Sequence, residues 1–276
     1  MKRVTVIGLG LIGGSVGLAL RERDPEVVVT GIDRPEIVAS PVALRVAHDL
    51  VATDDPTRVA GALAAELVVL AAPVGVIQRE LSRVLDQAEV AIDCGSTKRA
   101  ICASVAGHRR RSRFVPGHPM AGMPEGGIEQ ARADLFEGRR WLICPEESSA
   151  EACAVAEKLI ALVGAQAVRL TAAEHDRAVA RTSHVPQLLA SALLVAANSM
   201  GAAAAAGPAF AGATRVAGGP EAMWRDIFAT NADEIANALR ELVAELGTIQ
   251  QDLNGRPASL TAALGLLERA RRLRKS

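Results

Sequence analysis

The stretch VTVIGLGLIG, residues 4–13, decides the fold of the first half of this chain. A short β-branched run leads directly into glycines at the first, third and sixth positions of Gly-Leu-Gly-Leu-Ile-Gly. This spacing after a strand gives a tight turn, lets a pyrophosphate approach the backbone, and allows a helix to pack closely on the strand. The free amides and positive dipole end of that helix then face the phosphates. We therefore predict a dinucleotide site formed by Gly8, Gly10, Leu11, Ile12 and Gly13.

An acidic residue at the end of the second predicted strand indicates which dinucleotide binds. Asp33 follows the last glycine of the motif by 20 residues and closes the run 27–32. Its carboxylate can accept hydrogen bonds from the adenosine ribose and would repel the extra phosphate of NADP, so NAD is the expected cofactor. Arg34 leaves the selectivity open, because a guanidinium can bind a 2′-phosphate or stack on adenine. The alternative is that these residues have only a structural role. The glycines would then simply make a turn, and Asp33 would be an ordinary exposed turn residue.

Short β-branched runs alternate with helical patterns throughout residues 1–170. Such alternation is typical of βαβ units around a mostly parallel sheet. Helices with apolar residues at helical spacing are predicted at 15–23 and 76–85. The predicted strands are residues 4–7, 27–32, 67–71, 90–93, 114–115, 141–144 and 166–170. We therefore expect an α/β fold in which residues 1–170 form a Rossmann-like NAD-binding domain.

The remaining chain, residues 171–276, has a helical pattern to its end. Thr171 and Glu174 have the spacing of a capping box, which marks the start of a helix. Helical periodicity follows in 172–200, 220–246 and 259–274, with breaks at Pro186 and around residues 207–208. We expect an all-helical substrate and dimerisation domain. Exposed apolar helix faces in such a domain commonly pair between subunits, so the expected assembly is a homodimer.

Composition narrows the possible partners and locations. The chain has 31 basic and 31 acidic residues, and this balance predicts no nucleic-acid partner. Its four cysteines show neither the close pairing of a zinc site nor a disulfide framework, and its first residues do not resemble a signal peptide. No run approaches the roughly 18 uninterrupted apolar residues of a membrane span. We expect a cytoplasmic protein with a small-molecule substrate, no metal site and no membrane segment.

Two polar segments follow predicted strands, where open parallel sheets bind their ligands. Ser96 and Lys98 lie in DCGSTK, residues 93–98, and His118 lies in GHPMAG, residues 117–122. An imidazole can take a hydroxyl proton near neutral pH, which the oxidation of an alcohol by hydride transfer requires. The simpler alternatives are a helix cap for Ser96 and a structural role for His118. The pattern leaves the role of Lys98 open.

Two further candidates lie in the helical part of the chain. His184 belongs to SHVPQ, residues 183–187, where Pro186 must disturb the helical hydrogen bonding. Arg215 belongs to TRVA, residues 214–217. An arginine can hold a carboxylate by two parallel hydrogen bonds, which makes Arg215 the candidate anion anchor. A surface ion pair is the alternative for this side chain.

Taken together, these segments resemble the prephenate and arogenate dehydrogenase family. The likeness runs in the family's order over roughly residues 1–250. The glycine motif is common to many dehydrogenases, whereas the His-Pro-Met-Ala-Gly, Ser-His-x-Pro and Trp-Arg-Asp-Ile segments are together highly specific. The matching segments are GLGLIGGS (8–15), DCGSTK (93–98), GHPMAG (117–122), ARADLF (131–136), SHVP (183–186), TRVA (214–217) and WRDI (224–227).

The resemblance implies the oxidative decarboxylation of prephenate to 4-hydroxyphenylpyruvate in tyrosine biosynthesis. Hydride leaves the ring carbon that bears the hydroxyl and passes to NAD, carbon dioxide departs, and the ring becomes aromatic. By the same resemblance, His118 accepts the hydroxyl proton and Ser96 hydrogen-bonds near it. Arg215 then binds a substrate carboxylate, and His184 helps to orient the substrate.

Two departures from the family's pattern lie near the expected substrate side chain. Residues 207–210 read Gly-Pro-Ala-Phe where relatives often have a run of glycines, and Gln187 stands where many have a second histidine. They leave two substrates as alternatives, prephenate with a keto acid and arogenate with an amino acid.

Two other classes of protein share this layout. A β-hydroxyacid dehydrogenase or small-imine reductase is a rival on domain order alone, although the His118 segment argues against it. A non-catalytic NAD-binding sensor is favoured if Ser96, His118 and Arg215 do not converge on one site.

Overall fold

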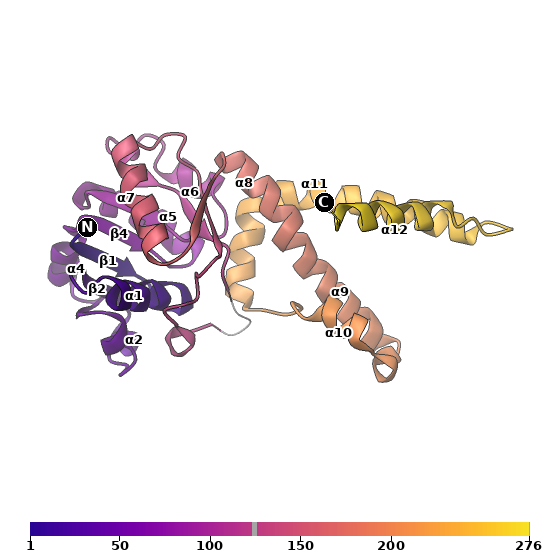
Figure 1. The fold of residues 1–276 in the computed structure, drawn as a ribbon, viewed down its shortest axis with the longest axis horizontal. Helices are drawn as coiled ribbons and strands as arrows, with labels where there is room; N and C mark the ends of the chain where they lie inside the picture. The colour runs from indigo at the N-terminus through magenta and orange to yellow at the C-terminus, as the bar shows by residue number, and fades with distance from the viewer. Residues whose placement is uncertain (123–125, 276) are drawn as a thin grey trace.

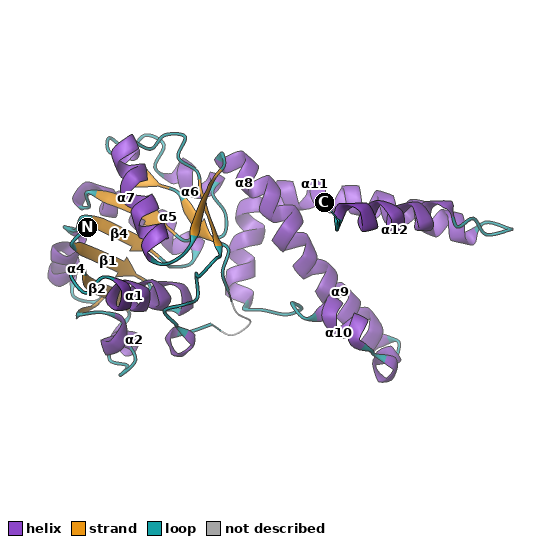
Figure 2. Ribbon diagram, viewed as in Figure 1, coloured by secondary structure: helices purple, strands orange, loops and turns teal. Residues whose placement is uncertain are grey.

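The computed structural model describes residues 1–122 and 126–275, and its first part is built around a parallel sheet (Figures 1 and 2). The strand order is β3-β2-β1-β4-β5-β6, with all neighbouring strands parallel. The strands are β1 Arg3–Ile7, β2 Val28–Asp33, β3 Asp49–Ala52, β4 Leu67–Leu70, β5 Val90–Asp93 and β6 Phe114–Val115. Because the order reverses between β1 and β4, ligands are expected in the crevice at the carboxyl ends of these two strands.

Helices pack on both faces of this sheet and form a hydrophobic core on each. Along β4, Leu67 and Val69 face one core while Val68 and Leu70 face the other, the alternation that a strand imposes. The first core includes α1 Leu11–Arg23, α3 Ala43–Val46 and α7 Ala150–Leu162, and α2 Pro35–Val38 packs beside it. The second core includes α4 Pro56–Leu63, α5 Val74–Gln87 and α6 Arg99–Ser104. The sheet is thus buried on both sides, as parallel sheets require.

A second, small sheet extends the Rossmann-like unit and carries one of the predicted site residues. It consists of β7 Gly117–Pro119, β8 Arg140–Ile143 and β9 Gln166–Arg169, with β7 antiparallel and β9 parallel to β8. His118 therefore lies in a short strand, opposite Leu142. Strand β3 was also absent from the prediction, because its four residues form a strand only by pairing with β2.

The chain from residue 172 onward is helical apart from its connections. Its elements are α8 Ala172–Val179, a π-helix Ala180–His184, α9 Val185–Ser199, α10 Pro208–Thr214, α11 Glu221–Asn254 and α12 Thr261–Leu273. The predicted capping box is present, since the Thr171 hydroxyl accepts from the Glu174 amide (3.1 Å) and the Glu174 carboxylate accepts from the Thr171 amide (2.8 Å). The disturbance expected at Pro186 appears as the π-helix just before it, whose wider turn accommodates a residue without an N–H.

Helix α11 is kinked at Asn231, and its part beyond the kink forms, together with α12, an arm that projects away from the sheet (Figure 1). Helix α12 folds back along α11, and Arg269 pairs with Glu245 across them (Figure 1). Within residues 1–122 and 126–275, no helix combines the length and apolar character needed to cross a membrane. The same residues contain no group of three or more His, Cys, Asp or Glu side chains that could hold a metal ion.

Candidate functional site

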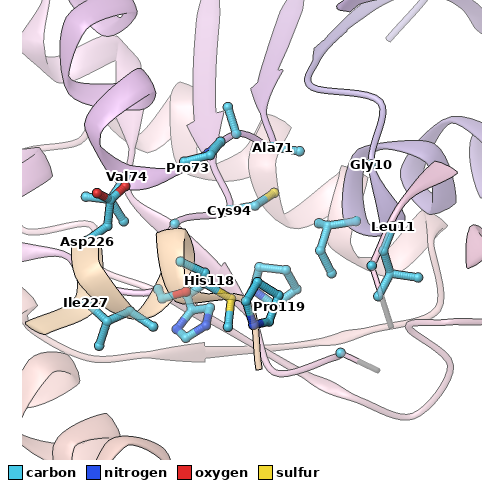
Figure 3. A pocket seen from close by; sticks show the side chains of 18 of the residues that line it. Gly10, Leu11, Ala71, Pro73, Val74, Cys94, His118, Pro119, Asp226 and Ile227 are labelled. Carbon is cyan, nitrogen blue, oxygen red and sulfur yellow. The ribbon is translucent and has the colours of Figure 1, made fainter. Parts of the chain in front are cut away.

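A cavity of about 470 Å³ lies at the carboxyl ends of β1, β4 and β5 (Figure 3). Its walls are mostly apolar with a few polar groups, as is typical of a small-molecule site. The Rossmann-like unit contributes residues 10–12, 71–74, 94–96 and part of 118–127, and the opposite wall is Pro220 with the first turns of α11. The site therefore lies where the sheet edge meets the helical part of the chain.

The glycine turn forms one end of this cavity, and its three glycines have different roles. Gly8 has φ +90°, and a Cβ there would lie 2.4 Å from the Ala71 carbonyl oxygen. A Cβ on Gly13 would lie 1.8 Å from the Gly8 carbonyl oxygen, so this position needs glycine for helix α1 to pack on the turn. A Cβ on Gly10 would meet nothing within 4 Å. Gly10 thus leaves open space at the amino end of α1, where a pyrophosphate fits.

Asp33 ends β2 beside the same turn. One carboxylate oxygen accepts from the Leu9 amide (2.6 Å) and the other from the Arg34 amide (2.7 Å). The Arg34 side chain is 67% exposed and pairs with Glu36 at 2.9 Å. Neither Asp33 nor Arg34 lines the cavity. Their position beyond the glycine turn fits the adenosine half of a dinucleotide whose other half enters the cavity.

His118 (Figure 3) lines this cavity, and so does Ser96. Burial lowers the pKa of His118 well below its usual value, and nearby His175, Lys98 and His184 lower it further. The ring is therefore neutral at physiological pH and can accept a proton. Its Nδ1 lies 2.9 Å from Nε2 of His175. The structure thus brings the two predicted catalytic residues together.

Behind His118 lies a buried acid and histidine pair on α8 that sequence reasoning missed. His175 and Asp176 are both 0% exposed, and Nδ1 of His175 lies 2.8 Å from Oδ1 of Asp176. The Asp176 carboxylate also accepts from the backbone amides of Lys98 (2.7 Å) and Arg99 (2.9 Å). Burial opposes its charge, but the hydrogen bonds from His175, Arg99 and Lys98 hold its pKa below the usual value. A His-Asp pair directly after the capping box was the available signal.

Lys98, whose role the sequence left open, lies outside the cavity and supports it. Its side chain is 0% exposed, and Nζ donates to the Asp93 carboxylate and to the Gly117 carbonyl oxygen (2.6 Å). The Asp93 carboxylate also accepts from the amides of Gly95 (2.8 Å) and Gly117 (3.0 Å). This buried ion pair ties the end of β5 to the residue before His118.

The two predicted substrate-binding residues do not line the cavity, so Arg215 does not meet Ser96 and His118 at one site in this structure. His184 is 1% exposed, lies edge-on to Trp224 with ring centroids 6.0 Å apart, and has its Nδ1 3.4 Å from the Asn231 amide nitrogen. Burial lowers the pKa of His184 to about 4. Arg215 is exposed at the carboxyl end of α10. Gln187 donates to the Gly218 carbonyl oxygen in the loop that leads to α11.

Three contacts hold α11 against the sheet edge and so keep the cavity wall in place. Asp226 accepts from the Gly75 amide (3.1 Å) at the amino end of α5. The Thr97 and Thr230 hydroxyls lie 2.8 Å apart. Farther along α11, Arg99 forms an ion pair with Asp233 (2.6 Å). These contacts join residues that follow β4 and β5 to residues 226–233 of α11.

Comparisons with known proteins agree with this architecture. The model of the prephenate dehydrogenase nucleotide-binding domain matches residues 16–169, and the model of the prephenate dehydrogenase dimerization domain matches residues 171–263. A probable prephenate dehydrogenase, NovF, from Streptomyces niveus is 34% identical over 263 residues, which cover 92% of this chain and 70% of the relative. A cyclohexadienyl dehydrogenase from Zymomonas mobilis is 28% identical over 256 residues, 89% of this chain and 86% of the relative.

Among solved structures, prephenate dehydrogenase from Aquifex aeolicus, in complex with hydroxyphenyl propionate and NAD+, has a TM-score of 0.88 with this chain. The alignment is 24% identical and covers 100% of this chain and 99% of the other. The predicted fold class, a Rossmann-like domain followed by a helical dimerisation domain, is confirmed.

Proposed function

The chain belongs to the prephenate dehydrogenase family, and we propose that it oxidises prephenate to 4-hydroxyphenylpyruvate and carbon dioxide, with NAD as the hydride acceptor. The observation that carries the proposal is His118, a neutral imidazole that faces a largely apolar cavity beside a dinucleotide turn. A neutral base at this place suits the removal of a hydroxyl proton, and apolar walls suit a carbocyclic ring.

The residues of the turn fit NAD. Gly10 leaves space for the pyrophosphate at the amino end of α1, and Asp33 provides a carboxylate for the adenosine ribose. When NAD is bound, its nicotinamide takes up the hydride. We place the substrate ring in the part of the cavity that is lined by Cys94, His118 and Ile227.

His118 and Ser96 carry the proton chemistry in this proposal. As the C–H bonding pair leaves the ring carbon as hydride, the hydroxyl proton moves to Nε2 of His118 and the C–O bond becomes a carbonyl. The pair from the breaking C–CO₂ bond moves into the ring, which becomes aromatic as the carbonyl oxygen becomes a phenolate oxygen and takes up a proton. Ser96 hydrogen-bonds at the same hydroxyl. Aromatisation supplies the driving force, so the protein mainly aligns the reactants, which can be worth about 7–11 kcal/mol.

The experiment that tests the proposal measures NADH formation by the purified chain, with prephenate and arogenate each offered with NAD and with NADP. We expect rapid turnover of prephenate with NAD, and a loss of about 10²- to 10⁴-fold for His118→Asn with NAD binding retained. His48→Gln, an exposed histidine on the other side of the Rossmann-like unit, is the matched control. Near-normal turnover of His118→Asn would reject the role of this residue.

We propose Arg215 as the anchor of a substrate carboxylate and His184 as a residue that helps to orient the substrate; because neither lines the cavity, both roles rest on the family resemblance. No hydrogen bond or ion pair of the Arg215 guanidinium occurs within the described residues, so the group is free to bind an anion. We expect Arg215→Gln to raise KM with a smaller effect on kcat. Arg225→Gln, which removes an exposed guanidinium paired with Glu221, is the control. An unchanged KM would place the anchor elsewhere.

A homodimer and a cytoplasmic location complete the proposal. Large apolar side chains are exposed on three helices of the dimerisation domain: Leu193 and Val195 on α9, Val243, Leu246 and Leu253 on α11, and Leu264, Leu267 and Leu273 on α12. Exposed apolar side chains of this kind can mark a site where two chains associate. Sedimentation should therefore show a species of two chains. All four cysteines are free, which fits a reducing compartment.

The division of the chain is proposed at Thr171, with residues 1–170 as the NAD-binding domain and residues 171–276 as the helical domain.

Arogenate is the second candidate substrate. Gln187 stands where many relatives have a histidine and leaves the choice between the two substrates open, and the chain is also similar to a cyclohexadienyl dehydrogenase. Turnover with arogenate alone would select it. Silence with all four combinations of substrate and cofactor would instead favour an NAD-binding sensor.

A further inference from the structure

A continuous chain of three side chains leads from the cavity to the contact between α6 and α8. His118 faces the cavity and contacts His175 (2.9 Å), and His175 contacts Asp176 (2.8 Å). The two inner members are 0% exposed. Water therefore cannot replace either of these contacts, and each side chain must supply the hydrogen-bond partner of the next one.

The acceptor at the inner end determines the direction of every hydrogen bond in this chain. The Asp176 carboxylate is held ionised by the amides of Lys98 and Arg99 and by the Arg99 guanidinium, so it can only accept. His175 must then donate from Nδ1, which leaves its Nε2 as a lone pair. That lone pair accepts from Nδ1 of His118. The remaining nitrogen of His118, Nε2, has no proton.

We propose that His175 and Asp176 are positioning residues that hold His118 in the tautomer with its proton on Nδ1, so that Nε2 accepts the hydroxyl proton of the substrate. This inference rests on the reaction proposed above and assigns a function to the pair on α8. When Nε2 takes the proton, His118 becomes an imidazolium and still donates from Nδ1 to His175. The negative charge of Asp176, one imidazole away, offsets the new positive charge.

Asp176 is a poor site for a test variant because it also holds the first amides of α6, so the substitutions are made at His175. His175→Gln keeps an amide oxygen near the position of Nε2, where it can accept from His118. His175→Leu removes the acceptor and leaves the ring of His118 free to carry its proton on Nε2. Both variants break the contact with Asp176, so they differ only in what they offer to His118.

We expect His175→Leu to lower kcat by about 10²- to 10⁴-fold, since a histidine held in the wrong tautomer loses most of its value as a base. KM for prephenate and the affinity for NAD should change by less than about threefold, because His175 touches neither ligand. His175→Gln should recover at least a factor of about ten in kcat over His175→Leu. A purely structural role of His175 would not produce this order, since both variants lose the contact with Asp176.

A second readout does not depend on turnover. In protein labelled with ¹⁵N-histidine, the wild-type ring of His118 should show a protonated Nδ1 and an unprotonated Nε2, and His175→Leu should move the proton to Nε2. The assignment comes from the signal lost in His118→Asn. His48→Gln, as the control, should leave the pattern unchanged.

Failure of the proposed function and failure of the inference about His175 would give different experimental results. Wild-type protein that oxidises neither prephenate nor arogenate would overturn the proposed function, whatever the tautomer. Wild-type protein that is active but carries the His118 proton on Nε2 would overturn the inference alone. Wild-type kcat in His175→Leu would overturn it as well.

Discussion

Replacing Lys98 by methionine removes one charge of a buried ion pair while keeping a side chain of similar length. Lys98 and Asp93 are both 0% exposed, and Nζ of Lys98 also donates to the Gly117 carbonyl oxygen. In the variant, Asp93 keeps two donors, the amides of Gly95 (2.8 Å) and Gly117 (3.0 Å). The carboxylate is thus left buried with hydrogen bonds but without a cation.

Breaking a buried pair by removing one partner costs about 3–5 kcal/mol of unfolding free energy. Because the two amides still stabilise the carboxylate, we expect the lower end, about 3 kcal/mol. At roughly 2–4 °C per kcal/mol for chains of similar size, Tm should fall by about 6–12 °C. The double variant Lys98→Met with Asp93→Asn leaves no buried charge and should be more stable than Lys98→Met alone.

Urea unfolding followed by circular dichroism measures these differences. Lys158→Met is the matched control, because Lys158 is exposed on α7 and its loss should change the unfolding free energy by less than about 0.5 kcal/mol. If Lys98→Met proved as stable as Lys158→Met, the pair would not behave as a buried, charged contact and the reasoning would be refuted.

Four further substitutions test the cofactor turn and a buried histidine. Asp33→Ser removes the charge that would repel a 2′-phosphate. The ratio of kcat/KM for NAD to kcat/KM for NADP should therefore fall by about tenfold or more, as expected for the loss of hydrogen bonds to a charged group. An unchanged ratio would show that other residues determine the cofactor selectivity. Gly13→Ala would put a Cβ 1.8 Å from the Gly8 carbonyl oxygen, so it should lower stability by at least about 1–3 kcal/mol. Gly10→Ala meets nothing within 4 Å and should keep the wild-type Tm while weakening NAD binding in a titration. The pKa of His184 is about 4 in the folded protein, against a usual value of 6.5. Between pH 6.5 and pH 4 the folded state therefore binds fewer protons than the unfolded state, so the free energy of unfolding falls as the pH drops through this range. His184→Gln should remove up to about 3 kcal/mol of this loss of unfolding free energy. If the variant and the wild type showed the same pH dependence, His184 would not be buried and neutral in the folded protein.

What could be predicted from the sequence was local chemistry. The turn at residues 8–13 requires glycine for reasons of backbone shape, and it acts over a few residues. The capping box at Thr171 and the break before Pro186 are equally local. Ser96 and His118 could also be found, because each follows a strand and parallel strands bring their carboxyl ends to one edge.

The tertiary structure alone decided which side chains lie behind and around that edge. His175 is 57 residues from its partner His118, and Asp176 is 78 residues from the Lys98 amide that it binds. No periodicity in the sequence relates such positions, because they meet only when α8 packs on the start of α6. The same holds for strand β3, which exists through its hydrogen bonds to β2, and for Arg215, whose exposed position at the end of α10 depends on the path of the helices around it. Motifs can be recognised in short segments of sequence because backbone geometry is local. Burial and hydrogen-bond partners, in contrast, depend on how the whole chain packs.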